Sequence, residues 1–403
     1  SDLAVQGQVI VVSLNYRLGS FGFLAHPSLA AENEGAVGNY GLLDQQLAIA
    51  WARRNAAAFG GDANNVTIFG QSAGGSSVCA QLVSPAMRGQ FQAAIIQSGV
   101  CNAKLLQSMP AALHEGEAFA KKLGCSGQGK EALACLRGLP PEKLLAGLGQ
   151  VGVTSEVPMR PVYGSAVMPE APETAFASGR FARVPLLIGS TKDEGTLLIA
   201  LDVNQDNNRR VKPLSEKSLQ ALNTPVQYGQ ELVKRFGVAH QAELLARYPL
   251  ARYGGSGWAA LGAILTDAYF ACDAESLRRS AAHYSVPVYG YEFDEAPLNS
   301  FIKGDQSGID LKAYHGAEFP FVFYNPMVKL SSAQEQYAQH IRADWARFAW
   351  QHEPESQSRW PLFDAQQQVQ ALRAQGEAAS GDFYQRHQCE YWLSGGAPPF
   401  VSR

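Results

Sequence analysis

Residues 65–75 read Asn-Val-Thr-Ile-Phe-Gly-Gln-Ser-Ala-Gly-Gly and place one serine between two glycines. The run Val66–Phe69 is short, apolar and rich in β-branched side chains, which predicts a buried strand, and the residues after the serine can continue as a helix. The Gly-x-Ser-x-Gly pattern is typical of a sharp strand–turn–helix unit with Ser72 at its apex. We expect Gly70 and Gly74 to be needed because side chains there would collide with the adjoining strand and helix.

A serine at the apex of such a turn is placed to act as a nucleophile. We expect a strained backbone at Ser72 that exposes its Oγ, with the Ala73 N–H directed at the oxyanion of a tetrahedral intermediate. The partial positive charge of the helix N-terminus would add to that stabilisation. The alternative is a glycine-rich turn with a serine helix cap, since the pentapeptide alone is a weak match in a chain with 39 glycines. The strand before it and the helix after it favour the nucleophile.

Three more motifs accompany this one: Asn15-Tyr-Arg-Leu-Gly19 continued by Phe21-Gly-Phe-Leu24, Gly38-Asn-Tyr-Gly-Leu-Leu-Asp-Gln45, and Phe59-Gly-Gly-Asp62. Together with residues 66–75 they resemble the type-B carboxylesterase (cholinesterase-like) family, in its bacterial type. The resemblance is dense over residues 1–100 and recurs in patches to residue 393. It implies one catalytic domain of the α/β-hydrolase fold over residues 1–403, with a mostly parallel central sheet flanked by helices. It also implies a serine carboxylic-ester hydrolase that needs no cofactor.

Composition excludes several other classes of protein. The 403-residue chain is 46% hydrophobic and 17% charged, which is enough apolar sequence for a large core. The net charge is −3, no basic cluster suggests nucleic acid, and no run of 18 apolar residues suggests a membrane span. We find no internal repeat, no low-complexity tract and no metal-site pattern. The expected partner is therefore a small-molecule ester.

Several other apolar runs predict strands, and most are continuous, which fits strands buried on both faces of a parallel sheet. They are Gln8–Tyr16, Ala93–Gln97, Val184–Gly189 and Val286–Phe293. Between the first strands lies the helical pattern Leu42–Asn55, which carries Leu43, Leu47, Ala50 and Trp51 on one face. Near the end, Gln334–Trp350 predicts an amphipathic helix that packs its apolar stripe into the core. Arg17 and Asp44 lie inside apolar motifs, so we expect a buried structural ion pair.

Two regions interrupt the alternation of strands and helices. Residues 103–183 are more helical and irregular, with helical patterns at Ala111–Leu123, Lys130–Leu136 and Glu142–Leu148. Residues 201–260 begin with a polar loop at 202–217 and continue as helices such as Gln227–Phe236 and Gln241–Tyr248. Insertions between sheet strands usually cover the active-site edge. We expect both regions to form a lid or the walls of a gorge.

A serine nucleophile needs a base, and the base needs a carboxylate that orients it. In α/β-hydrolases the chain order is serine, then acid, then histidine. Downstream of Ser72, the strand Val184–Gly189 runs into Ser-Thr-Lys-Asp-Glu-Gly195, at the strand end where sites in parallel sheets collect. The residues themselves leave Asp193 and Glu194 equally open. The resemblance of Lys-Asp-Glu-Gly to the family motif points to Glu194.

One of the eight histidines fits the role of the base. His315 lies after the last predicted strand, in Tyr-His-Gly-Ala-Glu318, and Gly316 provides a turn that can present the ring. Its place after the acid, and the resemblance to the family's His-Gly-x-Glu segment, make it the catalytic base. We expect Glu318 to be a structural hydrogen-bonding partner.

The six cysteines allow fifteen pairings, so the residues alone do not fix them. The resemblance implies a short disulfide loop, Cys125–Cys135, and a long-range bridge, Cys272–Cys389. We expect Cys79 to be a small buried apolar residue in the helix after Ser72, and Cys101 has no assignment. Two bridges predict a periplasmic or secreted protein, whereas six reduced thiols in a cytosolic enzyme are the alternative.

The sequence also departs from the family pattern. The family's Gly-Gly-Gly-type oxyanion loop, and the strand that feeds it, precede the point where this chain begins. That strand would lie between the Gln8–Tyr16 and Val66–Phe69 strands, and without it buried backbone edges would stay unpaired, at about 1–3 kcal/mol per group. We therefore expect an N-terminal companion polypeptide to complete the sheet and the oxyanion hole.

The residue before the serine bears on the substrate. Family members that bind cationic choline esters carry a glutamate there, and this chain carries Gln71, which favours neutral short- to medium-chain esters. Two other functions compete with ester hydrolysis. One is an inactive cholinesterase-like binding protein, which the presence of Ser72, Glu194 and His315 disfavours. The other is an amidase or thioesterase that uses the same triad, because fold and triad do not decide the acyl compound.

Overall fold

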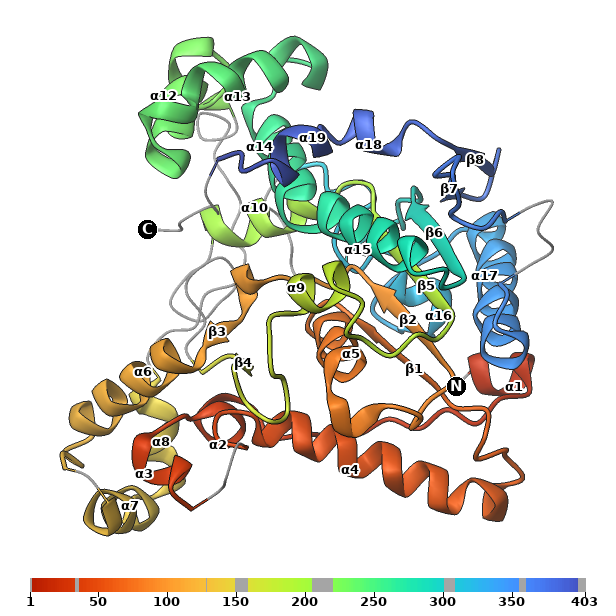
Figure 1. Ribbon diagram of the computed structural model, residues 1–403. Coiled ribbons are helices and arrows are strands. Elements are labelled where there is room, and N and C mark those ends of the chain that lie inside the picture. Colours follow the sequence, from red (N-terminus) through yellow and green to blue (C-terminus); the bar gives the residue numbers. More distant parts are fainter. Residues whose placement is uncertain are drawn as a thin grey trace.

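A six-stranded sheet forms the centre of the molecule (Figure 1). The computed structural model describes residues 2–32, 36–127, 129–148, 159–204, 220–300, 309–354 and 360–397. The strands run in the order β1-β2-β5-β6-β7-β8, all parallel except the last, which is antiparallel to β7. Their bounds are Thr67–Gln71, Ala93–Gln97, Leu186–Thr191, Val288–Phe293, Val369–Leu372 and Ala378–Ser380. This is the mostly parallel sheet that the sequence predicts.

Apolar side chains cover both faces of this sheet, which explains why its strands read as continuous apolar runs. Ala94 and Ile96 of β2 enter one core, and Ala93 and Ile95 enter the other. The first core is covered by α4 (Tyr40–Asn55), α5 (Ala73–Val83), α9 (Pro172–Ala177) and α15 (Cys272–His283). The second is covered by α1 (Asp2–Gly7), α16 (Phe319–Val322) and α17 (Ser332–Gln351).

The remaining helices gather in two groups (Figure 1). One group, with the small parallel pair β3 (Gln107–Ser108) and β4 (Val162–Tyr163), comprises α2 (Gly19–Phe23), α3 (Pro27–Ala30), α6 (Met109–Lys122), α7 (Gly129–Gly138) and α8 (Pro141–Gly147). The other surrounds a third core and comprises α10 (Glu194–Asn204), α12 (Pro225–Phe236), α13 (Gln241–Arg247), α14 (Gly257–Leu265), the π-helix η6 (Thr266–Ala271), α18 (Phe383–Arg386) and α19 (Cys389–Leu393). Short 3-10 turns also occur along the chain: η1 (Ala56–Phe59), η2 (Pro85–Met87), η3 (Ala103–Leu105), η4 (Val238–His240) and η5 (Leu250–Tyr253).

Most predicted elements are present with small shifts of their ends. The predicted helix Gln334–Trp350 begins two residues earlier, at Ser332, because Ser331 and Gln334 form a capping box there. Most of the polar loop predicted at 202–217 lies outside the described residues. The sequence did not predict β7 and β8, which are short and only partly apolar. Within the described parts of the chain, no helix combines the length and apolar character needed to cross a membrane.

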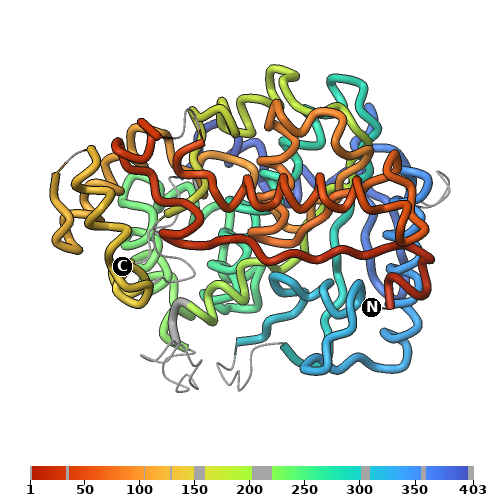
Figure 2. The backbone as a smooth tube through the Cα atoms, turned by 90° about the horizontal axis from the view of Figure 1, so that it is seen from below, coloured from red at the N-terminus to blue at the C-terminus, as the bar shows by residue number. Residues whose placement is uncertain are grey.

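The prediction of a paired strand at Gln8–Tyr16 is wrong. The segment runs as an extended stretch along the molecule (Figure 2). Among the described residues, however, it is not hydrogen-bonded to any strand as part of a sheet. Its side chains still alternate, since Val9 and Val11 pack against the second core while Ile10 and Val12 are exposed. The pattern of a strand is therefore present without a neighbouring strand to pair with.

Two further predictions, on the apolar face of α4 and on the Arg17–Asp44 ion pair, differ from the structure. In α4, Leu43 packs against the first core, but Leu47 is 65% and Trp51 47% exposed, so the described residues cover only part of the apolar face predicted for this helix. Arg17 and Asp44 do form a two-pronged ion pair, with nitrogen–oxygen distances of 2.8 and 2.7 Å. It is not buried, because the Arg17 side chain is 54% exposed. The apolar motifs led to the prediction of burial, but Leu18 and Phe21 beside Arg17 are themselves exposed.

All six cysteines are paired. The Cys125–Cys135 and Cys272–Cys389 disulfides have Cα–Cα distances of 5.5 and 5.1 Å, as the resemblance implied. The third bridge joins Cys79 to Cys101, with Cα atoms 5.7 Å apart, so the expectation of an unpaired Cys79 is wrong. The pairing arises because α5 packs against β2 and the loop that follows it, which brings together residues that are separated by 22 positions.

Candidate active site

Ser72 lies at the sharp turn between β1 and α5. Its backbone angles are φ 57° and ψ −119°, a conformation that costs energy for a residue with a side chain and that is typical of a nucleophile elbow. A Cβ on Gly70 would lie 2.4 Å from the Gly74 carbonyl carbon, so glycine is required at position 70. A Cβ on Gly74 would meet nothing within 4 Å. The second required glycine is instead Gly75, whose added Cβ would lie 2.7 Å from the Gly99 Cα.

Glu194 directly follows β5, which is separated from β1 in the sheet by β2. It is fully buried, and its Oε1 accepts a 2.7 Å hydrogen bond from the Thr191 N–H. Asp193 points elsewhere, because its carboxylate accepts from the Ala313 N–H at 3.4 Å. Burial raises the pKa of Asp193 to about 6. The structure therefore separates the two acids that the sequence left open, and Glu194 is the one that reaches a histidine.

His315 lies on a turn after β6 and joins the other two side chains. Its Nδ1 is 2.5 Å from Glu194 Oε2, and its Nε2 is 2.7 Å from Ser72 Oγ. Gly316 follows with φ 86°, a left-handed conformation that suits glycine and turns the chain behind the ring. The three side chains come from the carboxyl ends of β1, β5 and β6, which meet at one edge of the sheet.

The imidazole of His315 is buried in a negative environment. Burial alone would lower its pKa, but the charge and hydrogen bond of Glu194 and the charge of Glu318 raise the pKa of His315 above its usual value. Burial and the charge of Glu194 raise the pKa of Glu318 to about 7. Neither carboxylate oxygen of Glu318 has a hydrogen-bond partner among the described residues. The expectation that Glu318 is a structural hydrogen-bonding partner is therefore not met.

Other groups near the three side chains were found only in the structure. The Phe270 ring lies 4.8 Å from the His315 ring, centroid to centroid, and the Gly195 N–H donates to Thr266 Oγ1 at 3.0 Å. Nothing in the sequence near residue 270 signals this, because the contact depends on how a distant helix packs. Ala73 is the first residue of α5, so its N–H is one of the amides that a helix leaves without an internal partner.

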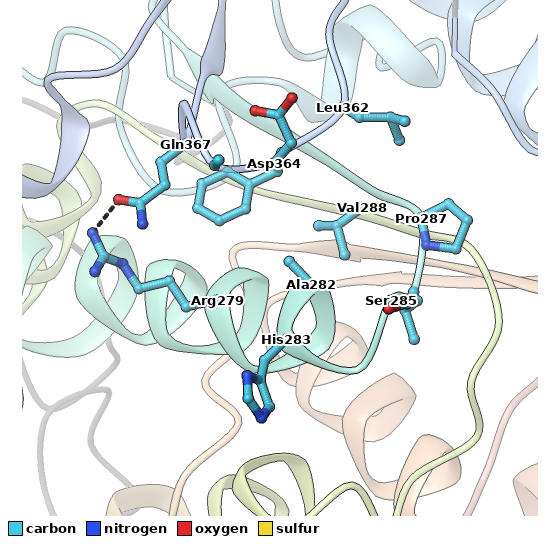
Figure 3. Close-up of a pocket in the computed structure, with 12 residues that line it drawn as sticks. Arg279, Ala282, His283, Ser285, Pro287, Val288, Leu362, Asp364 and Gln367 are labelled. Atoms are coloured by element: carbon cyan, nitrogen blue, oxygen red, sulfur yellow. Dashed lines mark hydrogen bonds between the residues drawn. The ribbon is translucent and has the colours of Figure 1, made fainter.

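A pocket of about 610 Å³ lies away from these residues (Figure 3). It is lined by the end of α15 and the beginning of β6, including Arg279, His283 and Val288. Arg279 donates across it to Gln367 at 2.5 Å. Because the pocket opens at the amino end of β6, it is at the opposite end of that strand from the side that leads to His315.

Residues 1–392 match the "Carboxylesterase family". The chain belongs to the carboxylesterase family. Its α/β-hydrolase fold accounts for the mostly parallel sheet with helices on both faces. Like the family, this carboxylesterase is a carboxylic-ester hydrolase.

Several relatives are similar to this carboxylesterase along most of its length. It is 33% identical to the para-nitrobenzyl esterase of Bacillus subtilis over 376 residues, which cover 90% of this chain and 68% of that protein. It is 32% identical to the cocaine esterase of Homo sapiens over 412 residues, covering 97% and 67%. It is 30% identical to the cholinesterase of Mus musculus over 407 residues, covering 97% and 65%. The chain thus spans about two thirds of the length of these relatives.

Proposed function

We propose that this carboxylesterase hydrolyses neutral esters of short to medium chain length through an acyl-enzyme formed on Ser72. One observation carries the proposal: the hydrogen-bonded series from Ser72 Oγ through His315 to Glu194, with distances of 2.7 and 2.5 Å. Nucleophile, base and orienting acid are the three roles that acyl transfer needs within hydrogen-bond reach of one another. Membership of the carboxylesterase family supports the choice of an ester as substrate.

The reaction follows from the direction of these contacts. His315 Nε2 accepts the proton of Ser72 as Oγ attacks the ester carbonyl carbon. The tetrahedral intermediate collapses when His315 returns that proton to the leaving alcohol, which leaves an acyl ester on Ser72. Water then repeats the sequence with His315 as base, and the carboxylic acid and free Ser72 are the products. The raised pKa of His315 helps it to take the proton in each half-reaction.

Glu194 and Ala73 have supporting roles in this proposal. Glu194 accepts from His315 Nδ1, which fixes the tautomer with a free Nε2 and stabilises the imidazolium. Its other oxygen is held by the Thr191 N–H, so the carboxylate does not turn away. The Ala73 N–H, with the positive end of α5 behind it, donates to the oxyanion.

The substrate class rests on the residue that precedes the serine. Gln71 Nε2 lies 3.5 Å from His315 Nε2, so a neutral amide occupies this position beside the reacting atoms. A cationic substrate would find no negative charge from that side chain. Residues 103–183 and 201–260 continue the chain from the carboxyl ends of β2 and β5, the same edge of the sheet as Ser72 and Glu194. We therefore propose them as the walls around the substrate.

We also propose that a strand-bearing polypeptide segment covers one face of the described structure. β1 ends the sheet on one side, and Ile10, Val12 and Leu14 point outward from the extended segment nearby. Leu47 and Trp51 of α4 add exposed apolar surface. A strand paired with β1 would satisfy its free backbone edge and bury such side chains, and its loop could supply further oxyanion donors.

Intact-mass analysis of the protein from its native source tests the covering segment. A co-purifying fragment, or a longer covalent chain, is the expected result. A lone 403-residue chain whose β1 amides exchange slowly with solvent would overturn the idea. We further propose a periplasmic or secreted location, since three disulfides persist in oxidising compartments.

A matched substrate set tests the reaction itself. We expect hydrolysis of p-nitrophenyl butyrate to exceed that of the corresponding anilide and to prefer neutral over choline esters. Ser72→Ala should lower the rate by several orders of magnitude without loss of folding. Faster cleavage of the anilide or thioester would assign the protein to another acyl-transfer class, and an unchanged rate in Ser72→Ala would reject the proposed nucleophile.

A further inference from the structure

A π-helical turn lies next to the candidate triad. α14, η6 and α15 follow one another without a break from Gly257 to His283, and the middle part, Thr266–Ala271, is π-helical. The Cys272 N–H donates to the carbonyl of Asp267, five residues back, which marks the inserted residue. Such insertions are rare, disturb the regular hydrogen bonds of a helix, and are frequent at functional sites. The residues that the π-helical turn contacts therefore bear on its role.

The inner side of η6 touches His315 and the backbone of the residue that follows Glu194. The ring of Phe270 packs on His315 with 4.8 Å between ring centroids and 46° between ring planes. Phe270 is only 7% exposed, so this position is fixed by packing. Thr266 Oγ1 accepts from the N–H of Gly195, the residue after Glu194, at 3.0 Å. One short turn thus contacts the base directly and holds the backbone beside the acid.

The outer side of the same turn is anchored to the residue that follows α13 and to α18 and α19 near the end of the chain. Asp267 accepts from the Tyr248 hydroxyl at 2.7 Å, and its other oxygen is 2.5 Å from His387 Nδ1. The Cys272–Cys389 disulfide follows at the end of the turn. A turn held this firmly from behind can keep an aromatic ring in one place against a catalytic side chain.

An aromatic ring at this distance also acts electrostatically. The face of a phenyl ring carries partial negative charge and attracts a cation within about 6 Å of its centroid. His315 becomes such a cation each time it accepts the serine proton. The charged groups that face His315 are Glu194, at the start of α10, and Glu318, before α16. Phe270 adds to their effect without carrying a charge of its own.

We infer that Phe270 is a positioning residue for the proposed reaction, presented by the π-helical turn so that its ring orients His315 and stabilises the imidazolium. This inference rests on the proposed function. It places the interrupted part of the helix at the site, since Phe270 of this turn contacts His315 and Thr266 contacts the backbone after Glu194, while Asp267 contacts His387. Removal of the ring should lower the pKa of His315, whereas a loss of packing that let water reach the imidazole would raise it, because burial alone lowers that pKa.

The test compares the pH dependence of kcat/KM for p-nitrophenyl acetate and butyrate in the wild type, Phe270→Leu and Phe270→Tyr. The acid limb of this profile reports the pKa of the free-enzyme base. In Phe270→Leu we expect the limb to move down by about half to one pH unit, and kcat to fall about five- to tenfold, with KM changing less. Phe270→Tyr keeps a ring and should restore both values to within about twofold.

A matched control separates this effect from simple destabilisation. Phe119 of α6 is buried to a similar degree and has no contact with the triad among the described residues, so Phe119→Leu should leave the acid limb in place. An unmoved limb in Phe270→Leu, or equal losses in the Leu and Tyr variants, would overturn the inference. A larger change in KM than in kcat, different for the two acyl chains, would make Phe270 a substrate-contacting residue instead. An inactive wild type would reject the proposed function, whereas an active one isolates the role of Phe270.

Discussion

His387 is the side chain whose loss we expect to destabilise the protein most, because it lies between two buried carboxylates. Its Nδ1 is 2.5 Å from an oxygen of Asp267, and its Nε2 is 2.6 Å from an oxygen of Glu292. All three side chains are almost entirely buried. When both carboxylates are ionised, these two contacts need a proton on each ring nitrogen, which makes the ring an imidazolium. It ties the C-terminal helices to η6 and β6.

The pKa of the His387 ring indicates how much the imidazolium contributes to the free energy of unfolding. Burial would lower the pKa of His387, but the charges and hydrogen bonds of Asp267 and Glu292 raise it to about 9. An unfolded-state pKa near 6.5 then gives a difference of about 2.5 units, which corresponds to roughly 3 kcal/mol. Because the folded pKa is the higher one, this stability is complete below about pH 6.5 and is lost as the pH rises through about 9.

The perturbation is His387→Gln, which keeps hydrogen-bonding groups and removes the charge. Glu292 keeps Arg386 and Asp267 keeps the Tyr248 hydroxyl, but both lose the buried cation between them, so we expect a loss of about 3–5 kcal/mol in the free energy of unfolding at pH 6. Denaturant unfolding of both proteins under non-reducing conditions, at pH 6 to 10, measures it. The difference between them should shrink toward pH 10, while exposed His283 serves as control, with His283→Gln expected to cost less than about 0.5 kcal/mol. A loss under about 1 kcal/mol at pH 6, or a pH-independent difference, would refute the reasoning.

Three further predictions concern the triad turn and the surface. Gly70→Ala should destabilise the protein by several kcal/mol or prevent folding, because the new Cβ would lie 2.4 Å from the Gly74 carbonyl carbon, whereas Gly74→Ala should leave thermal unfolding nearly unchanged. Equal effects in this pair would contradict the turn geometry. Arg17→Met should cost less than about 1 kcal/mol, since the ion pair with Asp44 is exposed, and a loss of several kcal/mol would show that another segment buries it. Glu194→Gln should lower kcat about 10³–10⁴-fold with the fold intact by circular dichroism, and a loss below about tenfold would remove Glu194 from the proposed mechanism.

Local sequence patterns predicted most of the fold and indicated where the residues of the candidate site lie. The turn around Ser72 and the strand before Glu194 are signals that a few neighbouring residues carry, so the sequence alone could place them. The choice between Asp193 and Glu194 was different in kind. Both follow the same strand, and only the direction of each side chain, toward the Ala313 amide or toward His315, separates them.

What the sequence missed depends on contacts between distant segments. Cys79 and Cys101 pair because α5 packs beside β2, and no local sequence pattern predicts this packing. Phe270 reads as an ordinary core residue, yet the π-turn brings its ring against His315. The predicted strand at Gln8–Tyr16 has the right alternation but no partner, since a strand exists only where another strand supplies hydrogen bonds.

Labelling with a fluorophosphonate ester tests the central proposal most directly, because only an activated serine reacts with it. The wild type, Ser72→Ala and His315→Gln would each be treated, and the modified peptide identified by mass spectrometry. The account predicts one adduct on Ser72 in the wild type, none in Ser72→Ala, and far slower labelling in His315→Gln. A well-folded wild type without an adduct, or with one on another serine, would contradict it.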